Sequence, residues 1–209
     1  MESVLIIIIA VTGIVSYLTW QKEEFFKKFM FNPYAVIHKK QYFRIITHAF
    51  LHGSWLHLII NMLVLYSFGR VVLLFFQNHH AFSSMPLFHF LVLYFGSIVF
   101  SSLYTLAKHK DNPDYNSVGA SGAVSAVIFT SIFFIPWHPV YLFAIIPVPG
   151  IVFGALYLVY SWHMSKKGQD NIGHDAHFWG AVFGFAYPLM VSPELIQEFF
   201  SKLLAVNIG

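Results

Sequence analysis

Several long apolar stretches constrain this sequence more than any other feature. The first covers residues 4–20, and spanning the hydrocarbon core of a bilayer takes about 20 apolar residues in a helix. Hydrophobic residues make up 57% of the 209 positions and charged residues only 10%, well below the roughly 25% charged content of soluble domains. The sequence therefore predicts an all-α, polytopic membrane protein.

We expect one membrane domain over residues 1–209, a six-transmembrane-helix bundle in which the long segment 21–54 after the first helix lies along the membrane interface. In that segment phenylalanines alternate with lysines, a composition typical of the headgroup region. The expected spans are about 4–20, 55–76, 86–107, 119–135, 140–162 and 177–191.

Two further features modify this topology. Pro147, Pro149 and Gly150 fall within the fifth expected span, and prolines remove backbone donors, so we expect a kink or break there. A mobile gate and a simple bend are equally compatible with it. Residues 192–209 carry apolar side chains at helical spacing, which predicts an amphipathic tail helix.

Composition also excludes some classes of chemistry. The chain has no cysteine, so disulfides, thiolate metal sites and cysteine nucleophiles are excluded. A net charge of +3, spread over several loops, gives no basic stripe of the kind that binds nucleic acid. The sequence leaves the oligomeric state open.

Polar residues inside membrane spans are costly, so they mark candidate functional sites. His57 and Asn61 lie early in the second expected span, Ser121 lies at the start of the fourth, and His177 opens the sixth. Successive spans alternate in direction, so the starts of even-numbered spans lie on the same membrane face. We therefore expect these four residues to meet at similar depth.

The residue types suggest roles. A serine hydroxyl is a weak nucleophile until a neighbouring base takes its proton, and histidine suits that task. Ser121 and His177 supply such a pair. Free N–H groups at a helix start favour a developing oxyanion, and His57 and Asn61 share one helical face from which they can donate to it. Asp170 and Asp175 lie in the loop before the last span, so we predict a Ser-His dyad.

Small residues surround these positions. Gly180 and Gly184 follow His177 in a Gly-x-x-x-Gly pattern, and Gly119 and Gly122 flank the serine. Such spacing lets membrane helices approach closely. Packing is the commoner reason for it, but here packing and chemistry require the same contact.

Together these residues resemble the rhomboid intramembrane proteases. The sequence G-A-S-G at 119–122 matches the family's G-x-S-G, H-L-I-I-N at 57–61 matches H-x-x-x-N, and residues 177–184 match H-x-x-G-x-x-x-G. Residues 44–52 are similar to the stretch that leads into the family's second span. The resemblance covers about 44–184, and three motifs in order are far more specific than one.

The resemblance implies an intramembrane serine endopeptidase with Ser121 as nucleophile and His177 as general base. His57, Asn61 and the Ser121 backbone N–H would stabilise the oxyanion, without a metal or organic cofactor. It further implies single-span transmembrane proteins as substrates and membrane lipids as partners. We expect an integral, multi-pass protein of the cell membrane, that is, of a plasma or inner membrane.

The sequence departs from the family at one position. Many members have a tyrosine one turn after the serine, stacked on the catalytic histidine, whereas this chain has Ser125. We expect another aromatic residue, such as Phe153 or Trp179, to support His177, or the base to be held less firmly.

Two indications of the orientation in the membrane disagree. Ten of the twelve Lys and Arg residues follow the odd-numbered expected spans, and the other two are Arg70 and Lys202. The positive-inside rule then places the candidate site on the cytoplasmic side, whereas the resemblance implies the reverse. Six of the ten lie in segment 21–54, where loop counting is less dependable, so we favour the family orientation.

Two alternative functions stay open. A catalytically inactive relative would bind transmembrane helices without cutting them, but such proteins usually lose the serine or the histidine. A histidine-rich transporter or metal-binding protein would use the cluster His48, His52 and His57. Without cysteines or acids in the spans, a metal site would need histidines alone.

Overall fold

The structure is a computed structural model that describes residues 2–142, 145–167 and 173–205. It is mostly helical, as predicted. The elements are α1 (Glu2–Trp20), α2 (Glu23–Phe29), α3 (Pro33–His38), α4 (Arg44–Thr47), the 3-10 helix η1 (His48–Phe50), α5 (Trp55–Asn78), α6 (Pro86–His109), α7 (Ser121–Phe134), β1 (Pro139–Leu142), β2 (Ile146–Pro149), α8 (Gly150–Lys167), α9 (His174–Val191) and α10 (Leu195–Leu204).

Within the described residues, three helices are long and apolar enough to cross a membrane. They are α1, α5 and α6, with 19, 24 and 24 residues and mean hydropathies of 2.2, 2.1 and 1.8. Helix α7 is apolar but has 14 residues, while α8 and α9 have 18 residues each and carry polar residues at one end. The chain is thus a helical membrane protein, and the six-span count and the interfacial segment stay predictions.

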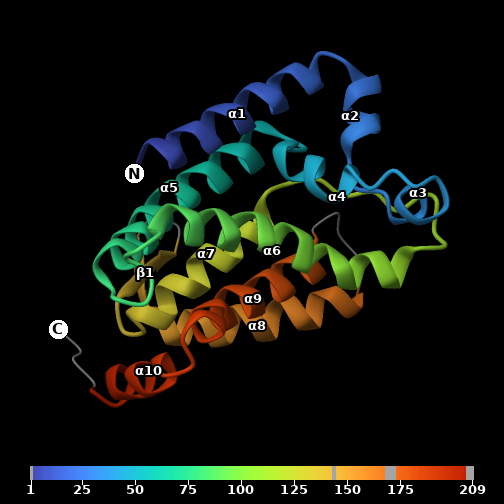
Figure 1. The fold of residues 1–209 in the computed structure, drawn as a ribbon. Coiled ribbons are helices and arrows are strands. Elements are labelled where there is room, and N and C mark those ends of the chain that lie inside the picture. The colour runs from blue at the N-terminus through green and yellow to red at the C-terminus, as the bar shows by residue number, and fades with distance from the viewer. Residues whose placement is uncertain (1, 143–144, 168–172, 206–209) are drawn as a thin grey trace.

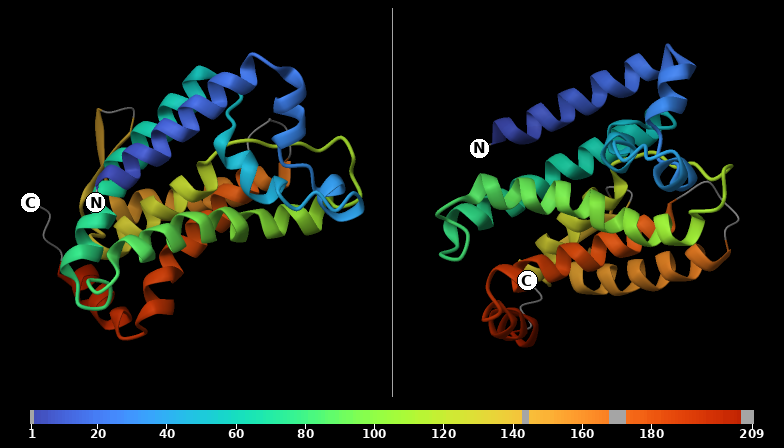
Figure 2. Two further views of the ribbon diagram at one scale, coloured as in Figure 1. Left: turned by 45° about the horizontal axis from the view of Figure 1, so that its top comes forward. Right: turned by 45° about the vertical axis from the view of Figure 1, so that its right-hand side comes forward.

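Helix α7 forms the centre of the bundle. Every residue from Gly122 to Phe134 is buried, because α5, α6 and α9 all contact this helix. Helix α8 lies outside α9, and α1 runs along α5 on the opposite flank (Figures 1 and 2). A helix so enclosed can hold a polar group at its first residue only if its neighbours leave space there.

The expected fifth span, 140–162, is wrong in its first part. Strands β1 and β2 form an antiparallel hairpin in which Val140 pairs with Val148 and Tyr141 with Pro147. Pro147 and Pro149 cannot donate the hydrogen bonds that a helix needs, but a proline is tolerated in a two-stranded hairpin edge. The prolines therefore precede a helix that starts at Gly150, and over the described residues the fold is all-α apart from this hairpin.

The two ends of the bundle carry different elements. Helices α2, α3 and α4 lie at one end, while the hairpin and α10 lie at the other (Figure 1). Within the predicted tail 192–209 a helix forms at α10, with Leu195 and Phe199 buried against the bundle; residues 206–209 lie outside the described part.

The segment between α1 and α5 is fastened to the loop before α7. Asn32 caps α3 by accepting a hydrogen bond from the Ala35 N–H (2.7 Å). Its amide also donates to the carbonyls of Pro113 (2.9 Å) and Tyr115 (3.1 Å). Phe31 and Ser117 exchange two backbone hydrogen bonds. These contacts fix the path of the chain as it approaches Ser121.

Candidate active site

Ser121 is the first residue of α7, and a glycine determines how the chain reaches it. Gly119 has φ +122°, a conformation that side chains other than glycine rarely adopt. Its N–H donates to the His48 carbonyl (3.0 Å). A Cβ at Gly119 would lie 2.8 Å from Cε1 of His57. The glycine thus allows both the turn into α7 and the close approach of the His57 ring.

Helix α5 presents the predicted oxyanion donors. Ser54 caps this helix by accepting a hydrogen bond from the His57 N–H (3.2 Å). Asn61 is one turn further along and only 6% exposed. Its amide donates one N–H to the His57 carbonyl (2.9 Å), and because a side-chain amide has two N–H donors, the second is left for another acceptor.

Small residues bring α9 against α7, as the Gly-x-x-x-Gly spacing predicted. A Cβ at Gly180 would collide with the backbone of Gly122, and one at Gly184 would collide with that of Ala126. Thr130 of α7 also donates to the Gly184 carbonyl (2.7 Å). The starts of the two helices therefore lie side by side, with His177 one turn before Gly180.

The predicted residues from α5, α7 and α9 line one cavity of about 510 Å³. His57 and Asn61 contribute from α5, Ser121 from the start of α7, and His177 from α9. Its other lining residues are mostly apolar: Ser54, Leu56, Ile60, Val64, Ser117, Val118, Val124, Ser125, Ile128, Tyr157 and Gly173. A polar core within an apolar wall can admit both water and an apolar peptide.

The electrostatics at Ser121 follow from its place in α7. The first N–H groups of an α-helix have no acceptor within the helix, and the aligned peptide dipoles make that end positive. Ser121 is the first residue of α7, so its N–H is one of these donors. Such a helix end favours a negative charge placed against it.

The acid nearest His177 in sequence has another role. Asp175 is 8% exposed and forms an ion pair with Lys108 of α6 (2.9 Å), whose ammonium also donates to the Ser165 carbonyl of α8 (3.0 Å). This contact ties together the ends of α6, α8 and α9. Asp170, the other acid considered, lies outside the described residues.

The aromatic ring that stacks on His177 comes from neither Phe153 nor Trp179, the two residues expected to support it. Trp179 packs against Phe100 and Tyr104 of α6, and Phe153 lies behind Tyr157. Tyr157 of α8 stacks on His177, with ring centroids 6.1 Å apart and planes at 23°.

Sequence reasoning missed Tyr157, although the expected fifth span, 140–162, contained it. The buried residues of α8 are Gly150, Gly154 and Ser161, and Tyr157 belongs to the same helical stripe. That spacing of small residues is the signal that could have identified it.

Two buried histidines lie close behind the cavity. His52 is fully buried, with its ring 4.9 Å from that of His57 and its Nδ1 3.1 Å from the Ser16 hydroxyl of α1. His48 lies 3.2 Å from the Ser102 hydroxyl. Burial lowers the pKa of His48 to about 4, and burial together with the nearby His57 lowers the pKa of His52 to about 3.

These histidines are therefore neutral near pH 7. Among the described residues, no three His, Asp or Glu side chains gather closely enough to hold a metal ion.

The chain is similar to known proteins. A family model described as a Rhomboid domain matches residues 39–194. "RHOMBOID-like protein 12, mitochondrial" of Arabidopsis thaliana is 28% identical over 87% of the chain and 56% of its own length. "Rhomboid protein 1, mitochondrial" of Saccharomyces cerevisiae is 28% identical over 78% of the chain and 46% of its own length. The chain thus spans about half the length of these curated relatives.

Proposed function

Because this chain belongs to the rhomboid family, we propose that it is an intramembrane serine endopeptidase with Ser121 as nucleophile and His177 as general base. The observation that carries the proposal is the shared cavity, which is lined by Ser121, His177, His57 and Asn61 from three different helices. These residues are up to 120 positions apart in sequence, so their convergence reflects the fold.

The proposed chemistry is acyl transfer. The Ser121 Oγ attacks the carbonyl carbon of the scissile bond while His177 takes the hydroxyl proton. The carbonyl oxygen becomes an oxyanion that accepts hydrogen bonds from the Ser121 N–H, His57 and Asn61. His177 then gives the proton to the leaving amine as the carbon–nitrogen bond breaks, and water releases the acyl group by the reverse proton transfers.

The proposed substrates are single-span transmembrane proteins embedded in the same membrane lipids. One wall of the cavity is formed by Leu56, Ile60 and Val64, which recur along one face of α5. Leu56 is 68% and Ile60 51% exposed. An apolar slope that leads to a polar site suits a helix that leaves lipid and unwinds, because exposed peptide groups are tolerated only where water or protein can bond them.

Catalysis by the two central residues is tested with purified protein in liposomes and a reporter transmembrane segment. Ser121→Ala and His177→Ala should each abolish cleavage while the melting temperature stays within a few degrees of the wild type. Retention of cleavage in either variant would refute the assignment. A wild-type chain that binds the segment without cutting it would instead identify an inactive relative.

The six-span topology is part of the proposal and is tested by labelling. Single cysteines at Ser83, between α5 and α6, and at Asn112, between α6 and α7, should be accessible from opposite sides of the membrane. Labelling of both from one side would contradict the topology. The side on which Asn112 reacts also decides between the family orientation and the one that the positive charges favour.

The membrane in which the chain resides is a separate proposal. The relatives are named as mitochondrial proteins, and this gives no support to a plasma membrane. We propose a mitochondrial membrane in place of the cell membrane, plasma or inner, that was expected from the sequence. Fractionation of cells that express the tagged chain tests this, and recovery with the plasma membrane of a eukaryotic cell would contradict it.

A further inference from the structure

Ser125 of α7 lies one turn after Ser121 and is 2% exposed. Its hydroxyl is 2.6 Å from the hydroxyl of Tyr157, which comes from α8. The bond therefore joins the helix of the candidate nucleophile to a helix on the outside of the bundle. A larger residue at position 125 would occupy the space that the Tyr157 hydroxyl needs.

Tyr157 is held from several directions. Its ring lies 5.6 Å from Phe153, one turn earlier on α8, and 5.7 Å from Phe129 of α7. With its hydroxyl fixed by Ser125 and its ring enclosed by these two, the remaining face lies against His177 at 6.1 Å and a small interplanar angle of 23°. A ring so restrained can in turn restrict the rotation of the imidazole.

Helix α8 is otherwise peripheral. Its buried residues are confined to Gly150, Gly154 and Ser161, and Tyr157 is the residue through which it reaches the cavity. The ring that flanks His177 thus belongs to a helix that contributes no other group to the site among the described residues.

Resting on the proposed function, we propose that Tyr157, fixed by its hydrogen bond to Ser125, is the positioning residue for His177, so that the placement of α8 controls the orientation of the base. Where α8 is displaced from α7, the hydrogen bond breaks and the ring leaves the imidazole. The site is therefore complete only while α8 is packed against α7, and cleavage depends on the position of this outer helix.

Kinetics of reporter cleavage in liposomes test this role. Tyr157→Leu removes the ring and should lower kcat on the order of 10- to 100-fold with KM unchanged within about twofold, because orientation of the base matters in the transition state and not in binding. Tyr157→Phe keeps the ring and should retain most activity, losing about two- to fivefold, the equivalent of one hydrogen bond. Ser125→Ala should lower kcat by the same factor as Tyr157→Phe. The Ser125→Ala/Tyr157→Phe double variant should lower kcat no further than either single variant.

Trp179→Leu is the matched control, because it removes a partly buried ring from α9 that faces α6 and not His177. Its kcat should stay within about twofold of wild type, although its melting temperature should fall about as much as that of Tyr157→Leu. The proposal is overturned if Tyr157→Leu keeps the wild-type kcat, or if Trp179→Leu lowers kcat as much as Tyr157→Leu does.

A second measurement does not depend on cleavage. The losses of melting temperature caused by Tyr157→Leu and His177→Ala should be less than additive in the double variant, because both remove the same ring contact. Additive losses would overturn the stacking role even if the protease assignment holds. Conversely, failure of Ser121→Ala to abolish cleavage would refute the protease while the coupling between the two rings persists.

Discussion

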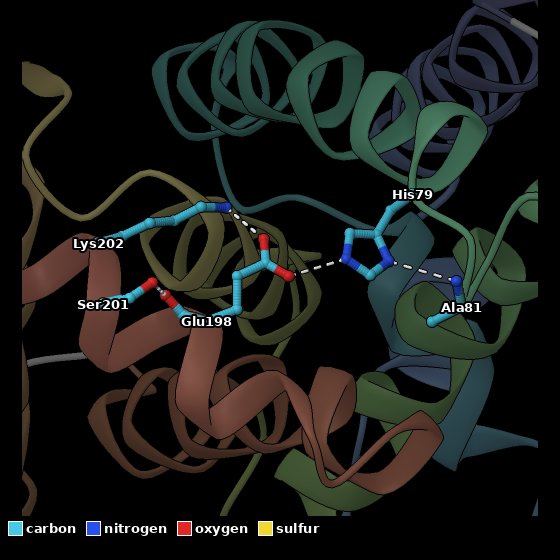
Figure 3. A network of polar contacts seen from close by, with 5 residues as sticks. All are labelled: His79, Ala81, Glu198, Ser201 and Lys202. Carbon is cyan, nitrogen blue, oxygen red and sulfur yellow. Dashed lines mark hydrogen bonds and ion pairs between the residues drawn. The ribbon is translucent and has the colours of Figure 1, made fainter.

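The two ends of the bundle place histidines in opposite settings. At one end His57 and His177 line an open cavity with Ser121. At the other end His79, the residue after α5, is enclosed by partners (Figure 3). Its Nε2 lies 2.9 Å from Glu198 of α10, and its Nδ1 accepts a hydrogen bond from the Ala81 N–H (3.3 Å).

The enclosed end is fastened by side chains. Glu198 also forms an ion pair with Lys202 (2.5 Å), whose ammonium lies over the rings of Phe75 and Phe134. Trp137, before the hairpin, donates to the Leu203 carbonyl (3.0 Å). These contacts attach α10 to α5 and α7.

The comparison shows how a candidate reactive site differs from a structural one. Histidine occurs at both ends, but His79 is bonded at both ring nitrogens, which leaves neither nitrogen for a substrate. At the cavity end, backbone contacts between α7 and α9 hold the framework, and polar side chains can face open space. Close helix contact through glycine supplements the side-chain bonds of this end, such as the Lys108–Asp175 ion pair.

The largest effect is expected where the comparison depends on glycine. Gly180→Leu should abolish cleavage and prevent stable folding, because its Cβ would collide with the Gly122 carbonyl group and neither backbone can yield. Gly13→Leu is the control, since nothing lies within 4 Å of a Cβ at that position of α1. Cleavage assays and melting temperatures in detergent measure both. A folded and active Gly180→Leu protein would show that the helices do not rely on this contact.

A second prediction compares the two ends of one helix. Asn61 and Asn78 both donate to the carbonyl four residues earlier in α5, at 2.9 and 2.8 Å, but only Asn61 lines the cavity. Asn61→Ala should lower kcat by about 10²-fold, as expected for loss of one oxyanion donor. Asn78→Ala should leave it unchanged. Equal effects of the two substitutions would remove Asn61 from the oxyanion hole.

The sequence predicted the cavity residues because their positions depend on a simple rule. His57, Ser121 and His177 each lie near the start of an even-numbered apolar stretch, so alternation of direction places them at one end. The structure starts α5 at Trp55, α7 at Ser121 and α9 at His174, close to the expected boundaries of 55, 119 and 177.

The features that escaped prediction depend on contacts between distant residues. The hairpin before α8 arises because Pro147 and Pro149 exclude helix, but sequence alone does not distinguish a kinked helix from a hairpin. The partner of His177 depends on which face of α8 turns inward, and only the small residues of that helix indicate this face. Likewise, His79 and Glu198 are 119 residues apart, and no spacing rule relates them.

A third prediction uses pH to test the two buried histidines behind the cavity. His48 and His52 have pKa values lowered to about 4 and about 3 by burial. Both imidazoles therefore stay neutral in the folded protein at a pH at which the same groups in the unfolded chain take up protons, that is, below about pH 6.5. Stability is therefore fully present at neutral pH and declines as the pH falls from about 6.5 towards those values. At pH 5 the loss is on the order of 2 kcal/mol for each histidine.

Melting temperatures at pH 7.5 and pH 5 measure this effect. His48→Asn removes one titrating group, so the difference between the two temperatures should be smaller in the variant than in the wild type, whatever its own stability. An equal difference in both proteins would show that His48 takes up its proton in the folded state.

The smallest effect is expected at the enclosed end. Although partial burial would raise the pKa of Glu198, hydrogen bonds from Lys202 and His79 hold it below its ordinary value of 4.5. Its contribution is thus present above about pH 4.5 and is lost only as the pH falls through the lower folded value, so the Glu198 contacts are retained at pH 5. Because Glu198 is 34% exposed, Glu198→Gln should cost only about 0.5–1 kcal/mol and leave cleavage unchanged. Glu194→Gln, an exposed acid before α10 that makes no capping bond, is the control; a loss of cleavage on Glu198→Gln alone would mean that the two ends are coupled.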